Sequence, residues 1–362
     1  MSISDRLLGK KSVNGRPHID AVSPALALPG GEVRIIGKAL RPPDLRRPSV
    51  RFGEIEASVL ISSDDFVVAR VPEGAASGPV VVGTNGHVSN PHTIKVASAI
   101  ADNVHPVTNP ALDREGNLYV TFSGPRGQKA PVSIFKIDTN YAVTPFLTDM
   151  MNATAIAFDR EGKMYVSSRH DETIYQVAPN ATVSSYAEGM GVATGIAFDR
   201  DENLYVGDRS GTVFKIARDR QIFVFATLEP SVSAYHLAIG PQGDLFVTGP
   251  TTSSFDAVYK IDPHGTVSTF YRGLGRPQGL AFDVEGNLYV AASLTGKRGI
   301  VKITPQGKAS LELAGQGLVG LAFAPGKSAF LATNGRDSSA SSVSGAIHHI
   351  SWNIAGLPLP PG

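Results

Sequence analysis

The chain has 362 residues, of which 42% are hydrophobic and 18% are charged, and its formal net charge is +1. This length exceeds the needs of one small core and predicts either two domains or one large repetitive domain. The near-zero charge and the lack of a long basic run argue against nucleic acid as a partner, because binding to phosphates requires a positively charged surface. The chain has no cysteine, which excludes thiol catalysis, disulfide bonds and thiolate metal sites.

The N-terminal residues 1–17 contain no apolar segment long enough for a secretory signal, and we expect them to form a flexible lead. No run elsewhere in the sequence approaches the length of a membrane span. These features predict a soluble protein with a cytoplasmic location. An exported protein whose signal had been removed would have the same sequence features.

Residues 18–96 read as short alternating strands separated by turns rich in Gly, Pro and Ser, and their number suits a small β-sandwich. The order of the segments "VSP", "PGGEVRIIG", "VRFG", "VVARVPEGAASGPVVV" and "TIKV" resembles that of the immunoglobulin-like TIG/IPT domain. This resemblance covers nearly the whole segment. It implies an interaction or spacer module that has no catalytic residues of its own.

Residues 97–355 contain a segment that recurs six times at intervals of 40 to 46 residues. Each copy predicts four short strands without helical periodicity, which is the pattern of a β-propeller blade. We therefore predict an all-β chain in which a six-bladed β-propeller follows the sandwich and residues 356–362 form a Pro-rich tail. The six copies are "PALDREGNLYV" (110–120), "AIAFDREGKMYV" (155–166), "GIAFDRDENLYV" (195–206), "HLAIGPQGDLFV" (236–247), "GLAFDVEGNLYV" (279–290) and "GLAFAPGKSAFL" (320–331).

The sixth repeat lacks a good fourth strand, because the chain ends in "NIAGLPLPPG" (353–362). The segment "KVASAIAD" (95–102), just before the first repeat, has the right pattern to replace that strand. Pairing between the two ends of the propeller segment would complete the last blade. We therefore expect residues 95–102 to join the sheet of the sixth repeat.

An acidic residue occupies one turn position in four of the six repeats. Its side chain can accept hydrogen bonds from backbone N–H groups two residues further on, and the following Gly can adopt positive φ. We therefore interpret these acids as turn residues rather than catalytic carboxylates. They are Asp113, Asp159, Asp199 and Asp283.

The repeat "GLAFDVEGNLYV" resembles the NHL-repeat and gluconolactonase-like group of six-bladed propellers, over about 250 residues. The resemblance implies the fold but leaves several functions open. The group includes calcium-dependent lactonases, other hydrolases, lyases and binding scaffolds.

Alternation of strand direction places the repeated turns on one face of such a propeller. The loops between second and third strands lie on the other face, where they differ between repeats in length and polarity. Variable loops on a regular scaffold are the usual place for a binding site. The candidate ligand-binding residues on this face are Asn109, Asn152, Arg169, His170, Asp208, Arg209, Tyr235, His236, Arg276, Gln278 and Asn334.

The resemblance implies Ca²⁺ held by a Glu, an Asp and Asn residues at the starts of the innermost strands, but here the first such position is Thr108 or Asn109. The candidate metal ligands are Asn152, Asp208 and His236, for Ca²⁺ or another divalent metal. His236 and Asp208 are also the candidate catalytic residues, with His236 as a general base in a lyase. An ion pair with Arg209 or Arg169 is the alternative interpretation of Asp208. A zinc site formed by His105, His170 and His236 is a further alternative.

Few acids and many amides on this face favour a binding or scaffold protein. The expected partner is a small polar ligand, a glycan or a protein segment, with the sandwich as a docking or spacer module. The alternative is a gluconolactonase-like hydrolase that depends on a divalent metal held by unusual ligands.

Overall fold

The computed structural model describes residues 15–42, 46–124, 129–253, 255–336 and 343–357. These residues form strands, turns and loops and include no helix, which confirms the all-β prediction. In this part of the chain there is accordingly no helix of the length and apolarity that a membrane crossing requires. The chain divides into two compact units, one up to Ser98 together with Glu312–Gly315, and one formed by Ala99–Leu311 with the residues from Gln316 onward.

The first unit contains two sheets. One has the strand order β1-β3-β7-β6, and the other runs β2-β10-β8-β4-β5, with β9 paired to β8. All these pairings are antiparallel except that of β2 with β10. The strands are β1 (His18–Ser23), β2 (Leu26–Ala27), β3 (Glu32–Lys38), β4 (Ser49–Phe52), β5 (Ile55–Glu56), β6 (Ser58–Ser62), β7 (Phe66–Arg70), β8 (Gly78–Thr84), β9 (His87–Val88) and β10 (His92–Val96).

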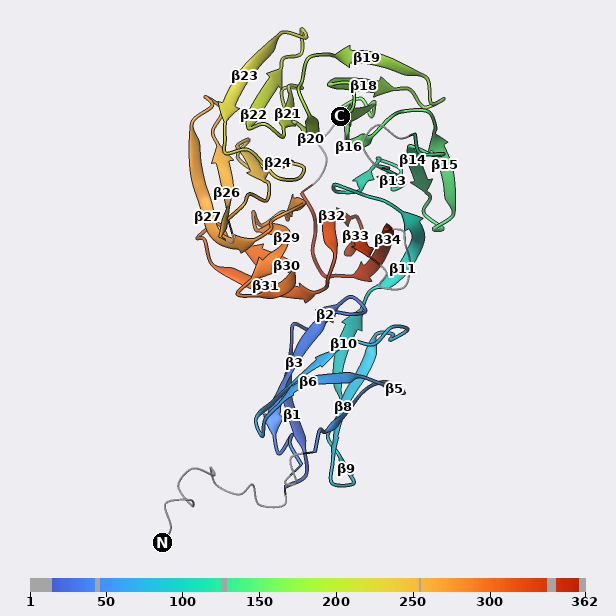
Figure 1. Cartoon of the computed structure of the whole chain (residues 1–362), viewed down its shortest axis with the longest axis vertical. Coiled ribbons are helices and arrows are strands. Elements are labelled where there is room, and N and C mark those ends of the chain that lie inside the picture. Colours follow the sequence, from blue (N-terminus) through green and yellow to red (C-terminus); the bar gives the residue numbers. More distant parts are fainter. Residues whose placement is uncertain (1–14, 43–45, 125–128, 254, 337–342, 358–362) are drawn as a thin grey trace. The chain divides into compact units, whose positions relative to one another are not determined.

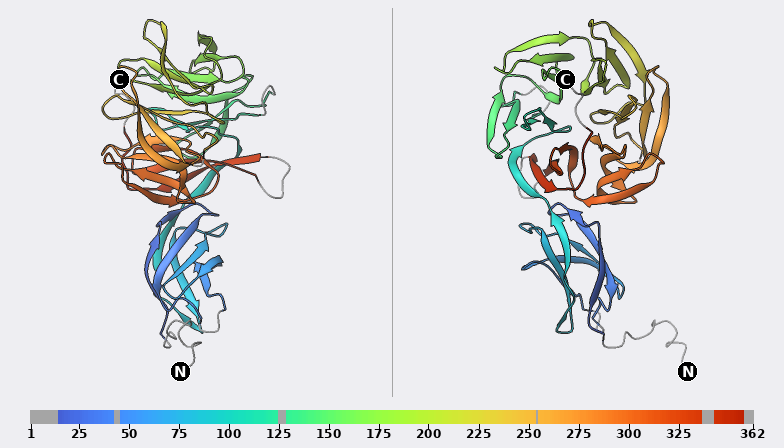
Figure 2. Two further views of the ribbon diagram at one scale, coloured as in Figure 1. Left: turned by 60° about the vertical axis from the view of Figure 1, so that its left-hand side comes forward. Right: turned by 180° about the vertical axis from the view of Figure 1, so that it is seen from behind.

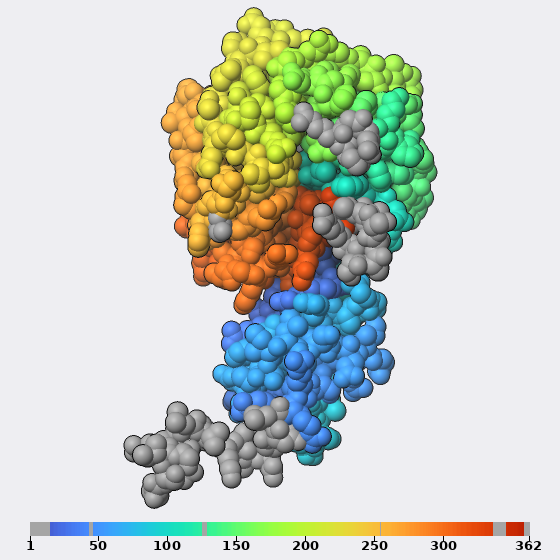
Figure 3. Space-filling view, in the orientation of Figure 1, coloured from blue at the N-terminus to red at the C-terminus, as the bar shows by residue number. Residues whose placement is uncertain are grey.

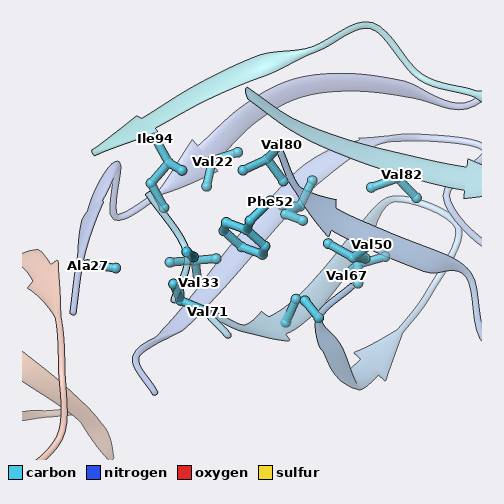
Figure 4. Close-up of a cluster of buried hydrophobic side chains, with 14 of the residues drawn as sticks. Val22, Ala27, Val33, Val50, Phe52, Val67, Val71, Val80, Val82 and Ile94 are labelled. Atoms are coloured by element: carbon cyan, nitrogen blue, oxygen red, sulfur yellow. The ribbon is translucent and has the colours of Figure 1, made fainter. Parts of the chain in front are cut away.

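The core of this unit follows from strict alternation along the strands. In β3, Val33 and Ile35 are buried while the residues on either side of each are exposed. Figure 4 shows Val33, Val50 and Val80 gathered around the ring of Phe52, from strands of both sheets. Period-two burial on both sheets gives one shared apolar layer, as expected of two sheets packed face to face.

The second unit consists of four-stranded antiparallel sheets that follow the sequence repeats. The first three repeats form the separate sheets β12-β13-β14-β15, β16-β17-β18-β19 and β20-β21-β22-β23. Their strands are β12 (Ala111–Leu112), β13 (Leu118–Thr121), β14 (Ile134–Ile137), β15 (Val143–Leu147), β16 (Ala153–Phe158), β17 (Met164–Ser168), β18 (Thr173–Val177), β19 (Val183–Ala187), β20 (Ala193–Phe198), β21 (Leu204–Asp208), β22 (Thr212–Ile216) and β23 (Ile222–Thr227).

The fourth and fifth repeats are joined in one sheet, because the end of β27 pairs with β29 through Leu274 and Gly275. The sixth repeat is completed by β11, in the order β11-β34-β33-β32. The strands are β11 (Ser98–Val104), β24 (His236–Ile239), β25 (Leu245–Thr248), β26 (Asp256–Ile261), β27 (Val267–Gly275), β28 (Leu280–Phe282), β29 (Leu288–Leu294), β30 (Lys297–Ile303), β31 (Ala309–Ala314), β32 (Leu318–Ala324), β33 (Ser328–Arg336) and β34 (Val343–Ser351).

The pairing of β11 with β34 confirms that the segment before the first repeat supplies the strand that the sixth repeat lacks. Figure 1 shows the sheets of this unit arranged around a common centre, with β16, β20 and β24 nearer to it than β19, β23 and β27. The view from behind in Figure 2 shows the same arrangement. In the space-filling view of Figure 3, the green to orange sheets form a continuous surface. This is the architecture of a β-propeller.

The repeated acids have the turn role that the sequence predicts. Asp199 accepts hydrogen bonds from the backbone N–H groups of Asp201 and Asn203, each at 2.9 Å, and from the hydroxyl of Tyr205 at 3.1 Å. Asp159 has the equivalent set of contacts in the preceding repeat. In these two repeats the carboxylate thus ties its turn to the second strand.

Candidate functional site

The variable loops lie at one end of the propeller sheets. At that end, the same backbone hydrogen bond is found in several repeats. In four repeats, a residue near the end of the second strand donates its N–H to the carbonyl of a residue before the innermost strand. We call the four donor residues the rim positions. The pairs are Ser123 to His105 (3.2 Å), Arg169 to Asn152 (3.4 Å), Arg209 to Val192 (3.1 Å) and Asn334 to Gly317 (2.8 Å).

The hydroxyl groups near the innermost strands are largely used in hydrogen bonds between neighbouring sheets. Thr108 Oγ1 donates to the carbonyl of Thr154 at 2.8 Å, and Thr248 Oγ1 donates to that of Gln278 at 2.5 Å. Ser167 Oγ donates in the same way to Thr194 at 2.5 Å. Buried polar groups require such partners, so these hydroxyls hold the sheets together and are not free for a ligand.

Asn109 serves the same purpose with its amide. Its Nδ2 donates to the carbonyl of Leu280 at 2.8 Å, and its Oδ1 accepts the N–H of Leu321 at 3.1 Å. Both ends of the side chain therefore connect the first repeat to the fifth and sixth. In the structure, the Asn109 side chain therefore links sheets of the propeller.

Asn152 and Arg169 are brought together by one backbone carbonyl. Asn152 Nδ2 and Arg169 Nη2 both donate to the oxygen of Gly124, at 3.1 and 3.0 Å. Asn152 is buried, whereas Arg169 is half-buried. Burial, and then the positive charge of Arg169, lower the pKa of the neighbouring His105 imidazole. The two predicted residues thus belong to one polar cluster.

Asp208 is buried and its carboxylate is used within its own loop. Oδ1 accepts the backbone N–H groups of Val192 at 2.9 Å and Ser210 at 3.1 Å, and Oδ2 accepts the Ser210 hydroxyl. Among the described residues, no ion pair is found between Asp208 and Arg209, one of the two arginines of the alternative interpretation. Arg209 Nε instead donates to the carbonyl of Ser231 at 3.2 Å. Asp208 resembles the turn acids more than a catalytic carboxylate.

His236 is only 2% exposed, and neither of its ring nitrogens has a hydrogen-bond partner among the described residues. Burial lowers the pKa of the imidazole to about 4, although the nearby Gln278 side chain acts in the opposite direction. The ring is therefore neutral at pH 7 and closed to solvent. A general base works best with a pKa near the working pH, so this environment does not suit that role.

Tyr235 lies in the core beside His236. Its ring belongs to the apolar cluster of the third and fourth repeats, its hydroxyl donates to the carbonyl of Glu229, and burial raises the pKa of the phenol. His170 and Arg276 are exposed, and Asn334 Nδ2 donates to the carbonyl of Pro106 at 3.3 Å.

The donor set does not fit a metal site. No three His, Asp or Glu residues within the described ranges lie close enough together to hold an ion, so the alternative of a three-histidine zinc site is wrong. A Ca²⁺ site built from Asn152, Asp208 and His236 would use a carboxylate that already accepts three hydrogen bonds and an imidazole that is closed to solvent. Parts of the variable loops, at 125–128, 254 and 337–342, lie outside the described residues.

Ser123 is a residue of this region that the sequence analysis missed. It is 1% exposed, and its Oγ has no hydrogen-bond partner among the described residues. It occupies the same repeat position as Arg169 and Arg209, four residues after the Tyr of each signature segment. Alignment of the repeats at that Tyr is the signal that would have found it.

No protein-family model and no curated protein matches the sequence. A candidate gluconolactonase of known structure is 18% identical, with a TM-score of 0.58, over 72% of this chain and 93% of its own. A luciferin-regenerating enzyme is 16% identical, with a TM-score of 0.56, over 74% and 98%. An auxiliary nutrient binding protein from Bacteroides thetaiotaomicron is 12% identical, with a TM-score of 0.54, over 93% and 98%. At these identities the likeness shows a shared β-propeller fold.

Proposed function

We propose that this chain is a binding protein that recognises a small polar ligand, a glycan or a peptide segment at the face of the propeller that carries the rim positions. The observation that carries this proposal is the state of the groups on which catalysis would depend. The carboxylate of Asp208 is used by its own loop, and the imidazole of His236 is neutral and closed to solvent. The side chain of Arg209, which is exposed and donates its Nε–H to the carbonyl of Ser231, belongs to the same face and is suited to recognition.

We also propose the number of blades and the boundaries of the two domains. We assign six blades to the propeller, because the six sequence repeats each correspond to four strands once β11 joins the last sheet. We assign a TIG/IPT-like sandwich to residues 18–96, as a spacer or partner-docking module, and the propeller to residues 97–355. Two packed sheets with a shared apolar layer support the first assignment. The likeness to the nutrient binding protein, which covers 93% of this chain, extends over both.

The test is a direct comparison of binding and turnover. Purified protein is offered a panel of neutral and acidic monosaccharides and oligosaccharides in calorimetry, and a panel of sugar lactones in a hydrolysis assay. The hydrolysis assay is run with Ca²⁺, Mg²⁺, Mn²⁺ or Zn²⁺ and with a chelator. We expect saturable binding without turnover. Metal-dependent hydrolysis of a lactone would contradict the proposal and favour the hydrolase alternative.

A further inference from the structure

The outermost strand of the third repeat has one paired edge and one open edge. This strand is β23, which pairs with β22 in the order β20-β21-β22-β23, and Figure 1 shows it on the outer side of its sheet. Ile222, Phe223 and Val224 in β23 are 43%, 48% and 66% exposed. Three consecutive large apolar side chains thus face solvent along one open edge. An edge of this kind is a template for another strand.

The outermost strands of three other repeats carry small polar residues or proline where β23 carries Phe223 and Val224. Equivalent positions are defined by pairing with the third strand of each sheet. Proline removes a backbone donor from an open edge, and short polar side chains give a second strand little apolar surface to bury. Among these four strands, β23 therefore lacks both kinds of protection. The equivalents of Phe223 and Val224 are Thr144 and Pro145 in β15, Ser184 and Ser185 in β19, and Ser268 and Thr269 in β27.

The open edge of β23 also carries unused backbone groups. In an antiparallel sheet, alternate residues of an edge strand turn their N–H and C=O groups away from the sheet. The N–H of Ala217 donates to the carbonyl of Gln221 at 2.8 Å, just before β23 begins. This bond fixes the phase of the alternation, so Ile222 and Val224 are the residues that turn outwards. Among the described residues, no backbone group outside β22 bonds to either of them.

Opposite charges lie at the two ends of β23. Arg218, Asp219 and Arg220 precede the strand and Glu229 follows it, and all four are exposed. Two arginines outweigh one aspartate, so the start of the strand is basic, whereas its end is acidic. Within the described ranges, none of the ion pairs involves Arg218 or Glu229. Both charges are therefore available to a second chain.

We infer that β23 is a homodimer interface, in which the edges of two copies pair antiparallel about a two-fold axis at Phe223. Ile222 of each copy would exchange backbone hydrogen bonds with Val224 of the other, and the apolar side chains would be buried between the copies. Arg218 of each copy would lie near Glu229 of the other, whereas parallel pairing would bring like charges together. A two-fold axis makes the interface self-complementary, which is the usual form of a homodimer.

The first experiment measures the mass of the purified full chain by sedimentation velocity over a wide range of concentration. We expect a reversible equilibrium between monomer and dimer without larger species, because pairing uses the open edge of both copies. A protein that stays monomeric at every concentration would overturn the inference, and the edge would then be left to a different protein. Open-ended aggregation would overturn it as well.

Two variants of β23 test the edge itself. Val224→Pro removes an outward N–H and leaves the bonds between β22 and β23 in place, so it should weaken the dimer by about tenfold or more. Phe223→Ser combined with Val224→Ser copies the residues of β19 and should weaken the dimer without introducing a proline. The control is Val183→Ser, which removes a side chain that is 38% exposed from β19 and should leave the dimer unchanged. Urea unfolding of each variant verifies its fold, and a dimer that survives both changes would overturn the inference.

Charge reversal tests the direction of pairing. Glu229→Arg should weaken the dimer, because it places a second base near Arg218 of the other copy. Adding Arg218→Glu to the same chain exchanges the two charges and should restore the affinity. A double variant that pairs no better than Glu229→Arg alone would contradict the antiparallel arrangement.

Hydrogen exchange of the unmodified protein, followed by NMR, gives a test that needs no variant. The amides of Ile222 and Val224 should exchange slowly in concentrated samples, where the dimer is formed, and quickly in dilute samples. Their equivalents in β19, Val183 and Ser185, should exchange quickly in both. A dimer in which Ile222 and Val224 stay unprotected would use another surface and would overturn the inference.

Discussion

The two ends of the propeller sheets are built by different rules. At the end with the repeated turns, the same residue types make the same contacts in successive repeats. Arg160 Nη2 donates to the carbonyl of Arg200 at 2.6 Å, and Arg200 Nη2 donates to that of Pro241 at 3.2 Å. At the other end, the rim positions keep one backbone hydrogen bond but carry Ser, Arg, Arg and Asn.

This difference separates structural from functional polarity. A side chain that recurs together with its hydrogen bonds is explained by the need to build each sheet. A side chain that varies while the backbone contact beneath it is kept needs another explanation, and ligand recognition is the one that variable loops on regular scaffolds usually support. Asp208 lies at the variable end but follows the structural rule, so position alone does not decide.

The strongest test of this comparison removes a turn acid. Asp199→Ala leaves two backbone N–H groups and the Tyr205 hydroxyl without their acceptor. We expect the free energy of unfolding, measured with urea, to fall by about 3 kcal/mol, because each lost partner is a charge-assisted bond in a partly buried site. Asp201→Ala, an exposed change in the same turn, should alter it little. A small effect of Asp199→Ala would mean that the repeated acids are not structural.

The turn acids were predictable because their contacts are local. Asp199 and its partners lie within six residues of each other, and the pattern of an Asp at the turn followed by alternating apolar residues is visible in four of the six repeats. The order of strands and the use of residues before the first repeat to complete the sixth followed from the same periodicity.

The contacts of the candidate site were not predictable, because they join distant repeats. Asn109 is bound to residues 171 and 212 positions away, and no local pattern reports such partners. The sequence also placed His236 at the start of an innermost strand without indicating that its neighbours would close it off. Which polar groups are used by the scaffold became clear only from the packing of the sheets.

Lowering the pH should affect the stability of the folded protein through the buried His236 but not through an exposed histidine. The His236 pKa is about 4 in the folded protein against 6.5 for the unperturbed side chain. Between these values the unfolded state binds a proton that the folded state does not. The contribution of His236 to stability is therefore complete above pH 6.5 and falls as the pH is lowered towards 4, by roughly 3 kcal/mol in total.

The measurement is urea unfolding at pH 7 and at pH 4.5 for the wild type and His236→Gln. The loss of stability in acid should be smaller in the variant because the variant lacks the His236 contribution, while the partly buried His105 and His348 keep theirs. His264→Gln, at an exposed turn of the opposite end, should behave as the wild type. Identical acid losses in His236→Gln and wild type would show that the ring is not buried as described.

Asp208→Asn distinguishes the structural from the metal-binding interpretation of that acid. The amide keeps the shape of the side chain but removes the charge and replaces one acceptor, so it weakens the bonds from Val192 and Ser210. We expect a loss of about 2 kcal/mol in urea unfolding, with or without Ca²⁺. If the carboxylate were a metal ligand, Ca²⁺ would stabilise the wild type and not the variant.

The smallest change in stability should come from the two arginines that differ only in the end of the sheets at which they lie. Arg200 and Arg209 each donate to a backbone carbonyl at 3.2 Å, and each is exposed. Replacing either with Gln should lower the free energy of unfolding by about 0.5 kcal/mol or less, because hydrogen bonds at exposed positions contribute little. Two variants of equal stability then differ only in ligand affinity. A loss of ligand binding confined to Arg209→Gln cannot come from unfolding and must come from the charge at the variable end.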